Sequence, residues 1–167
     1  HVYVHVLIRD AEGQKMSKTK GNVIDPLAVM KEYGTDALRF TLAAFAAQGR
    51  DIKLAEDRIE GYRNFCNKLW NASRFVFMNL EGYQGTCQLD EHTEKSIADQ
   101  WILSRLNNTT QEVNLALENF KFNDASLAVY KFIWNEYCDW YIEFAKSRLQ
   151  EEGPEKIAAQ NVLVHVL

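Results

Sequence analysis

Residues 13–26 read GQKMSKTKGNVIDP, a lysine-rich turn between glycines that leads into a helix start. Its central positions hold three lysines and two hydroxyls: Lys15, Ser17, Lys18, Thr19 and Lys20. Lysine ammonium groups on long side chains can follow phosphate oxygens that move during a reaction, and hydroxyl and backbone N–H groups add hydrogen-bond donors. Glycine lets the backbone of such a loop change position. The stretch therefore predicts a flexible loop that holds a polyphosphate.

A lysine-rich turn beside a glycine can also be an ordinary solvated loop. No charge pattern by itself names a ligand, so for this stretch alone the solvated loop is the more common outcome. The formal net charge of the chain, −4, does not decide the question, because a local basic patch can bind phosphates on an acidic protein. Evidence from the rest of the sequence is needed to decide between a phosphate-binding loop and a solvated loop.

The residues on either side of the loop predict a strand and two short helices. Residues 1–8 read HVYVHVLI and are apolar and β-branched, as in a largely buried strand. We expect helices at about 26–33 and 36–48. Their boundaries follow from two expected N-caps and two glycines that end them: Asp25, Thr35, Gly34 and Gly49.

From residue 54 onward the pattern becomes that of long helices. Apolar residues at helical spacings predict three long helices and the start of a fourth: about 55–81, 94–119, 124–150 and from about 155. Thr93 and Asn123 are the expected N-caps of the second and third helices. Short connections favour an antiparallel up-down bundle, whose core we expect to contain Trp70, Trp101, Trp134 and Trp140. The predicted fold class is therefore mostly α, a helical bundle preceded by a short strand–loop–helix piece.

The loop and the GNVIDP that follows it resemble the KMSKS signature of class I aminoacyl-tRNA synthetases. Further motifs occur in the family's order: YGTDALRF at 33–40, GRDI at 49–52, RNFCNKLWNA at 63–72 and CDWYIE at 138–143. The first two look like the valine, isoleucine and leucine group, and the last two look like valyl-tRNA synthetases. Two positions depart from the family pattern. Thr19 stands where serine is commoner and keeps the hydroxyl, and Val6 stands where the family usually has glycine.

The resemblance implies an enzyme that activates valine with ATP and transfers it to tRNA(Val) in the cytoplasm. Lys18 matches the motif's ATP-contacting second lysine, and Lys15 and Lys18 would be the catalytic cations that stabilise the leaving pyrophosphate. The motif implies five ATP-binding residues: Lys15, Met16, Ser17, Lys18 and Thr19. Met16 would anchor the loop on apolar surface, while the two hydroxyls would fix the loop or donate to phosphate. Lys20 is either an outer guide for phosphate or a solvated side chain. Mg²⁺ would arrive with ATP, and no metal site is expected within the chain.

In the same family a helical anticodon-binding domain follows the catalytic α/β region. Residues 1–52 would then be the end of the catalytic region, and residues 53–167 would be part of the anticodon-binding domain. Candidate contacts to tRNA phosphates are basic residues on the first long helix: Arg58, Arg63, Lys68 and Arg74. For each of them, an ordinary solvated helix face is the alternative.

The chain has the features expected of an excised fragment. No His-x-Gly-His motif occurs, and residues 162–167 read VLVHVL, still apolar. We expect ATP and valine to bind through a catalytic half outside this chain, so the chain alone should be inactive. The whole enzyme is expected to be monomeric, and apolar surface exposed by truncation would let the fragment self-associate.

The cysteines and the hydropathy pattern point to no further chemistry. Cys66, Cys87 and Cys138 lack metal-ligand spacing and are expected as reduced thiols. No apolar run approaches the ~20 residues that span a bilayer, so we expect no membrane contact.

Two alternatives remain open. An isoleucyl-tRNA synthetase fragment would share the lysine loop and the bundle, but its sequence after Gly49 and around Cys138 should differ. A non-enzymatic RNA-binding helical module would make the lysine loop incidental.

Overall fold

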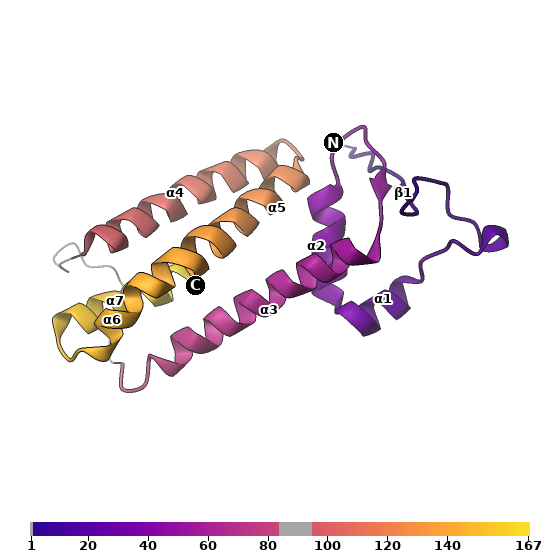
Figure 1. The fold of residues 1–167 in the computed structure, drawn as a ribbon. Coiled ribbons are helices and arrows are strands. Elements are labelled where there is room, and N and C mark those ends of the chain that lie inside the picture. Colours follow the sequence, from indigo (N-terminus) through magenta and orange to yellow (C-terminus); the bar gives the residue numbers. More distant parts are fainter. Residues whose placement is uncertain (1, 84–94) are drawn as a thin grey trace. The chain divides into compact units, whose positions relative to one another are not determined.

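The computed structural model describes residues 2–83 and 95–167 (Figure 1). The expected cap Thr93 and the thiol of Cys87 lie outside these residues. The chain divides into two compact units that interleave along the sequence, the first from His1–Asn67 with Glu112–Val129 and the second from Lys68–Gln111 with Tyr130–Leu167. In chain order the elements are β1 (Ile8–Arg9), η1 (Lys18–Lys20), α1 (Pro26–Tyr33), α2 (Thr35–Phe45), β2 (Ile52–Lys53), α3 (Glu56–Met78), α4 (Ile97–Glu118), α5 (Phe122–Lys131), η2 (Phe132–Tyr141), α6 (Ile142–Gln150) and α7 (Pro154–Val166). The mostly α fold class is confirmed.

Only the end of the predicted first strand is a strand. β1 pairs in parallel with β2, and Ile8 lies opposite Ile52. Val2 and Val4 are 92% and 83% exposed, so the prediction of a largely buried strand over residues 1–8 is wrong. The reason is that a sheet of two short strands provides no covering layer for the residues that precede it.

The two short helices form, with one difference at their junction and one at the end of the second helix. The expected end of the second helix at Gly49 is wrong, because the backbone leaves the helical conformation at Ala46 and α2 ends at Phe45. The Asp25 carboxylate accepts a hydrogen bond from the Leu27 N–H at 2.9 Å, and Pro26 starts α1. Gly34, at a φ of 93°, ends α1. The expected N-cap Thr35 is wrong, because Thr35 is already the first helical residue and Gly34 takes the cap position without a side-chain bond.

The predicted helix over 124–150 is confirmed as one uninterrupted helix made of α5, η2 and α6. Its middle part, η2, is π-helical, with the wider turn in which each bond spans five residues. The expected N-cap Asn123 is wrong, since the backbone is already helical at Phe122. The tight turn before it places Phe120 at a φ of 57°, and the Lys121 N–H donates to the Ala116 carbonyl at 2.8 Å.

Each unit has its own hydrophobic core. In the first unit, α1, α2 and α3 meet over the buried residues Val29, Ala37, Leu38, Leu54 and Ile59. In the second unit, α3, α4, η2, α6 and α7 share a core that includes Val76, Ile102, Tyr137, Tyr141, Val162 and Leu163. Helices far apart in the sequence therefore close one core, as a bundle requires.

The tryptophans divide between this core and the surface. Trp101 packs against the core of the second unit, and half-buried Trp134 stacks on Tyr130 with ring centroids 5.5 Å apart. Trp70 and Trp140 are 68% and 58% exposed, so their predicted place in the core is wrong. They occur within apolar stretches but on the outward side of their helices, which periodicity over a few residues does not resolve.

A buried charged network joins three helices of the second unit. Asp99 is fully buried, and both of its oxygens lie 2.8 Å from the Arg148 guanidinium. The Tyr141 hydroxyl donates to Asp99 at 2.7 Å, and the Ser96 N–H donates to it at 2.9 Å. Ser96 accepts in return from the Asp99 N–H, which makes a capping box at the start of α4. Arg148 also donates to the Glu155 carbonyl at 3.2 Å, in the first turn of α7.

This network makes the second unit sensitive to acid. Burial works to raise the pKa of Asp99, but the hydrogen bonds from Arg148 and Tyr141 outweigh burial and hold the pKa below its ordinary value of 3.8. The unfolded chain therefore takes up a proton first. The stabilisation is present above the ordinary pKa and is lost as the pH falls through the folded-state pKa.

We accordingly expect the free energy of unfolding of the second unit to fall below about pH 5, and Asp99→Asn to remove part of that decline. All four tryptophans of the chain lie in this unit, so urea unfolding followed by tryptophan fluorescence at pH 3–7 measures the effect. Asp139→Asn, at a half-exposed pair, is the control and should keep the decline. An Asp99→Asn variant with the unsubstituted pH dependence would contradict the expectation.

Candidate functional site

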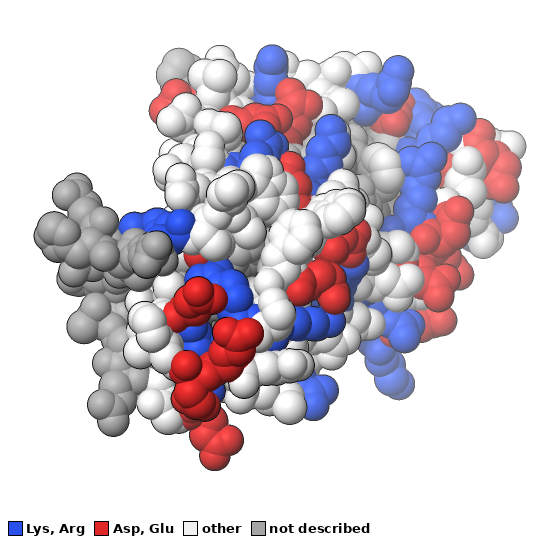
Figure 2. Space-filling model, turned by 60° about the vertical axis from the view of Figure 1, so that its left-hand side comes forward, with Lys and Arg blue, Asp and Glu red and all other residues white. Residues whose placement is uncertain are grey.

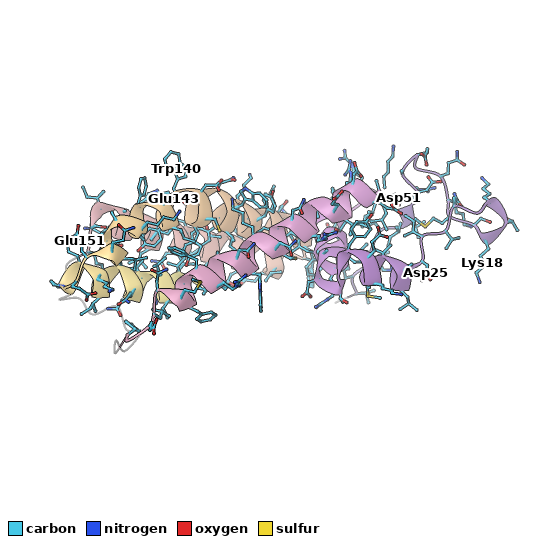
Figure 3. The ribbon with its side chains drawn as sticks, turned by 60° about the horizontal axis from the view of Figure 1, so that its bottom comes forward. Lys18, Asp25, Asp51, Trp140, Glu143 and Glu151 are labelled. Atoms are coloured by element: carbon cyan, nitrogen blue, oxygen red, sulfur yellow. The ribbon has the colours of Figure 1, made fainter. Side chains whose placement is uncertain are left out.

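The lysine loop places its cations at the surface of the first unit. Lys15, Lys18 and Lys20 are all exposed, and residues 18–20 form the single 3₁₀ turn η1. Gly21 ends that turn at a φ of 67°. Figure 3 shows Lys18 at the outer end of the loop.

The two lysines predicted to be catalytic have no carboxylate partner among the residues that the structure describes. Within residues 2–83 and 95–167, no salt bridge involves Lys15 or Lys18. Lys20 lies 3.5 Å from the Gln14 side-chain oxygen, at the limit of a hydrogen bond. The loop thus presents positive charge that no carboxylate of the described residues neutralises, and such a free charge is what binding of a polyphosphate requires.

The backbone of the loop is fixed by Asp10 and Asn22. The Asn22 side chain donates to Asp10 at 2.7 Å and accepts from the Ser17 N–H at 2.8 Å. Asp10 also accepts from the Gln14 N–H at 2.6 Å. The hydrogen bond from Asn22 is the main reason that the pKa of Asp10 lies below its ordinary value.

Other contacts of the loop match what the motif implies for its remaining residues. Met16 packs against the hydrophobic core of the first unit, as an anchor would. The hydroxyls of Ser17 and Thr19 lie 2.7 Å apart and share a hydrogen bond, which fits a role in fixing the loop.

A basic cleft lies beside the loop in the same unit. Its volume is about 450 Å³, and it is lined by Phe45, Arg50, Asp51, Ile52, Lys53 and Arg58. The Arg58 guanidinium lies over the Phe45 ring, 4.7 Å from its centroid. Asp51 forms an ion pair with Arg9 that lowers the pKa of Asp51, so the acid in the cleft is already compensated.

Arg50 and Lys53 join Arg58 in this cleft, and the sequence alone did not single them out. The Lys53 side chain lies against Gly13, where an added Cβ would come within 2.9 Å of the Lys53 Cε. This proximity depends on the parallel pairing of β1 with β2 over more than forty residues of sequence. A motif search could have noted Arg50 in GRDI, but nothing in the pattern predicts the cleft.

The other predicted RNA contacts lie in different surroundings. Lys68 pairs with Asp139 at 2.5 Å and lies 4.4 Å from the Trp134 ring centroid, so its charge is already engaged. Arg63 and Arg74 are exposed. Arg58 and Arg63 are five residues apart on a helix and so point in directions about 140° apart. Figure 2 shows basic and acidic side chains intermingled over the face in view.

The described residues hold no other reactive cluster. Among them, no group of three or more His, Cys, Asp or Glu side chains could hold a metal ion. Cys66 and Cys138 are free and half-buried, and burial raises the pKa of Cys138 to about 11, which lowers the reactivity of that thiol. No helix of the described part is long and apolar enough to cross a membrane.

Two family models match the chain. Residues 1–55 match tRNA synthetases class I (I, L, M and V), and residues 99–167 match the anticodon-binding domain of tRNA ligase. Among solved structures, the Agrobacterium radiobacter K84 agnB2 LeuRS in its ternary complex with tRNA and LeuAMS has a TM-score of 0.73 over 98% of this chain and 20% of that one. At 20% identity this match shows the fold alone.

Similar curated proteins are named valine--tRNA ligase. The Geobacter sulfurreducens protein is 60% identical over 99% of this chain, and the Thermotoga maritima protein is 54% identical over 100% of it. The chain spans 19% of the length of each of these relatives. The isoleucyl alternative is not favoured by these matches. The chain belongs to the class I tRNA synthetases and, among them, to the valine--tRNA ligase family.

Proposed function

We propose that the chain is the part of a valine--tRNA ligase that stabilises the leaving pyrophosphate and contributes to tRNA binding. The observation that carries the first role is the exposure of Lys15 and Lys18 on a fixed loop, without a carboxylate partner among the described residues. In the proposed reaction the valine carboxylate attacks the α-phosphorus of ATP, and pyrophosphate departs. Negative charge then grows on the departing oxygens.

The lysines act on that developing charge. Cations that meet the leaving oxygens more closely in the transition state than in the ground state raise the rate of the chemical step. Lys18, in the η1 turn, is the first candidate, and Lys15 is the second. Ser17 and Thr19 can turn a hydroxyl toward phosphate when the loop closes. Mg²⁺ enters with ATP, because the loop supplies cations and hydroxyls rather than carboxylates.

We propose a division of the chain into two parts, which the two family matches support. Residues 1–52 end the catalytic region, and residues 53–167 belong to the anticodon-binding domain, consistent with matches to 1–55 and 99–167. We propose tRNA(Val) as the RNA substrate and the cytoplasm as the location of the protein. We further propose that the complete ligase is monomeric, and that the chain alone self-associates through exposed apolar side chains such as Trp70 and Trp140.

The chain alone should not catalyse valine-dependent exchange of pyrophosphate with ATP. It spans 19% of the length of the Geobacter sulfurreducens relative, and the proposal assigns the ATP and valine pockets to the remainder. Radiolabelled pyrophosphate exchange at saturating ATP and valine measures this, with a complete valine--tRNA ligase as the positive control. Robust exchange by the purified chain would refute the assignment.

The basic cleft should contribute to tRNA affinity. Arg50→Ala and Arg58→Ala are each expected to weaken binding of tRNA(Val) severalfold and to lower the slope of log affinity against log salt by about 1, as for loss of one phosphate contact. Filter binding with cognate and non-cognate tRNA at several salt concentrations measures both quantities. Lys31→Ala, which removes an exposed lysine of α1, is the matched control. Unchanged affinity and slope in both arginine variants would exclude the cleft from the interface.

A further inference from the structure

We propose that Asp10 and Asn22 are positioning residues that set where Lys15 and Lys18 leave the loop. This inference rests on the proposed function of the lysines, but it concerns two residues that do not themselves reach phosphate. We call the two side chains and their hydrogen bonds the Asp10–Asn22 latch.

The latch joins the two ends of the loop. Asn22 Nδ2 donates to Asp10 Oδ2 at 2.7 Å, a bond between residues twelve apart in sequence. Asp10 is only 9% exposed, so this bond is shielded from water by its surroundings. A hydrogen bond from an amide to a shielded carboxylate is stronger than a neutral one.

Each partner also holds loop backbone. Asp10 Oδ1 accepts from the Gln14 N–H at 2.6 Å, and the Asp10 N–H donates to the Gln14 carbonyl at 3.1 Å. On the other side, Asn22 Oδ1 accepts from the Ser17 N–H at 2.8 Å, and Asn22 Nδ2 lies 3.3 Å from the Lys15 carbonyl. The latch therefore holds the backbone on both sides of Met16.

This grip determines the directions of the two catalytic lysines. Lys15 lies between the two backbone groups that the latch fixes, Gln14 N–H and Ser17 N–H. The position of Lys18 also depends on Ser17. The Lys20 N–H donates to the Ser17 carbonyl at 3.1 Å, so the η1 turn that carries Lys18 starts from the Ser17 backbone. A side chain of Lys18's length can miss its target by more than an ångström if Ser17 rotates. Misplacement of about 1 Å can cost roughly 100-fold in rate.

A latch that only stabilises the fold would have different consequences. Loss of a positioning bond lowers the rate of the chemical step, whereas loss of a merely structural bond lowers stability and the affinities together. The lysine ammonium groups remain present in latch variants, so initial binding of ATP should persist. The expected signature is therefore a fall in kcat for adenylate formation with little change in the KM for ATP.

The test uses a complete ligase, obtained by replacing the matching segment of the Geobacter sulfurreducens relative with this chain's sequence. Asn22→Ala should lower kcat for valine-dependent pyrophosphate exchange by about 10- to 100-fold and change the KM for ATP less than about threefold. Amide hydrogen exchange of Ser17 should speed up in the same variant, because its N–H loses its acceptor, Asn22 Oδ1.

A swapped pair supplies the rescue. In Asp10→Asn with Asn22→Asp, the new asparagine can donate to the new aspartate and still accept from the Gln14 N–H, and the aspartate still accepts from the Ser17 N–H. The swap loses one contact of the latch, the 3.3 Å donation to the Lys15 carbonyl. We expect the double variant to recover kcat to within about fivefold of the unsubstituted ligase, while each single substitution stays low. Lys18→Ala, measured in parallel, reports on the proposed function by itself.

Two outcomes would overturn the latch. The first is an Asn22→Ala variant with unchanged kcat although its Ser17 amide exchanges faster. The second is a swapped pair no more active than its single variants. If Lys18→Ala lowers the rate in those same experiments, the proposed function survives the failure of the latch.

Discussion

Replacing Lys18 with alanine in the complete ligase should lower the rate of valyl-adenylate formation by at least about tenfold and leave tRNA binding nearly intact. Lys18 is exposed at the outer end of a loop whose base is held by the Asp10–Asn22 latch, and within the described residues no carboxylate neutralises it. Its charge is therefore available to the departing oxygens. Because the interaction grows in the transition state, the loss should appear mainly in kcat.

Single-turnover measurements with ATP and valine would give that rate, and filter binding would give the affinity for tRNA(Val). Lys31→Ala is the matched control, since Lys31 is another exposed lysine of the first unit, on α1. A Lys18→Ala ligase that forms the adenylate at the unsubstituted rate would remove Lys18 from its assigned role.

Replacing Arg148 with methionine should destabilise the second unit by about 3–5 kcal/mol, the usual result of removing one partner from a buried ion pair. Arg148 is 15% exposed in its side chain, and its partner Asp99 is fully buried. Without the guanidinium, the hydrogen bonds that Asp99 keeps from the described residues are those from Tyr141 and Ser96. A buried carboxylate is then left with an uncompensated charge.

Urea unfolding at pH 7, followed by tryptophan fluorescence, measures the loss. Arg74→Met removes an exposed arginine of α3 and should change stability by less than about 0.5 kcal/mol. Adding Asp99→Asn to Arg148→Met should restore part of the stability, because the double variant has no buried charge at position 99. A change below about 1 kcal/mol for Arg148→Met would show that the network does not stabilise the bundle.

Local signals predicted much of this structure because local chemistry determines it. An aspartate followed by a proline favours a helix start whatever the surrounding fold. Asp25 and Pro26 start α1 in the structure in this way. The long helices also follow from periodicity, and the interruption at Gly153–Pro154 appears as predicted, with α7 starting at Pro154. Thr35 and Asn123 failed as caps because the neighbouring residues, Gly34 and Phe122, already set the helix starts.

Features that need distant partners were not predictable from the chain. The prediction of a buried strand over residues 1–8 was wrong because burial depends on neighbouring layers of structure, which a local sequence pattern does not reveal. The lysine loop was found from its motif, but its latch requires Asp10 and Asn22 to meet across the loop. The basic cleft likewise requires β1 to pair with β2. The engagement of Lys68 by Asp139 depends on two helices packing together.

The sequence motif and the structure support the same role for one residue, Lys18. The resemblance to the motif implies that Lys18 contacts ATP. The structure places the exposed Lys18 side chain, without a carboxylate partner among the described residues, on a loop held at its base. Neither observation alone separates a phosphate-binding loop from a solvated one. Together they favour the phosphate-binding loop.

A crystal structure of the complete ligase with ATP and valinol, which lacks the attacking carboxylate, would measure the distance from Lys18 Nζ to the β- and γ-phosphate oxygens. We predict hydrogen-bond contact, about 3 Å, from Lys18 or from both Lys18 and Lys15, with the Asp10–Asn22 bond intact. Lysine ammonium groups turned away from the phosphates and paired with carboxylates of the protein would contradict the proposed function.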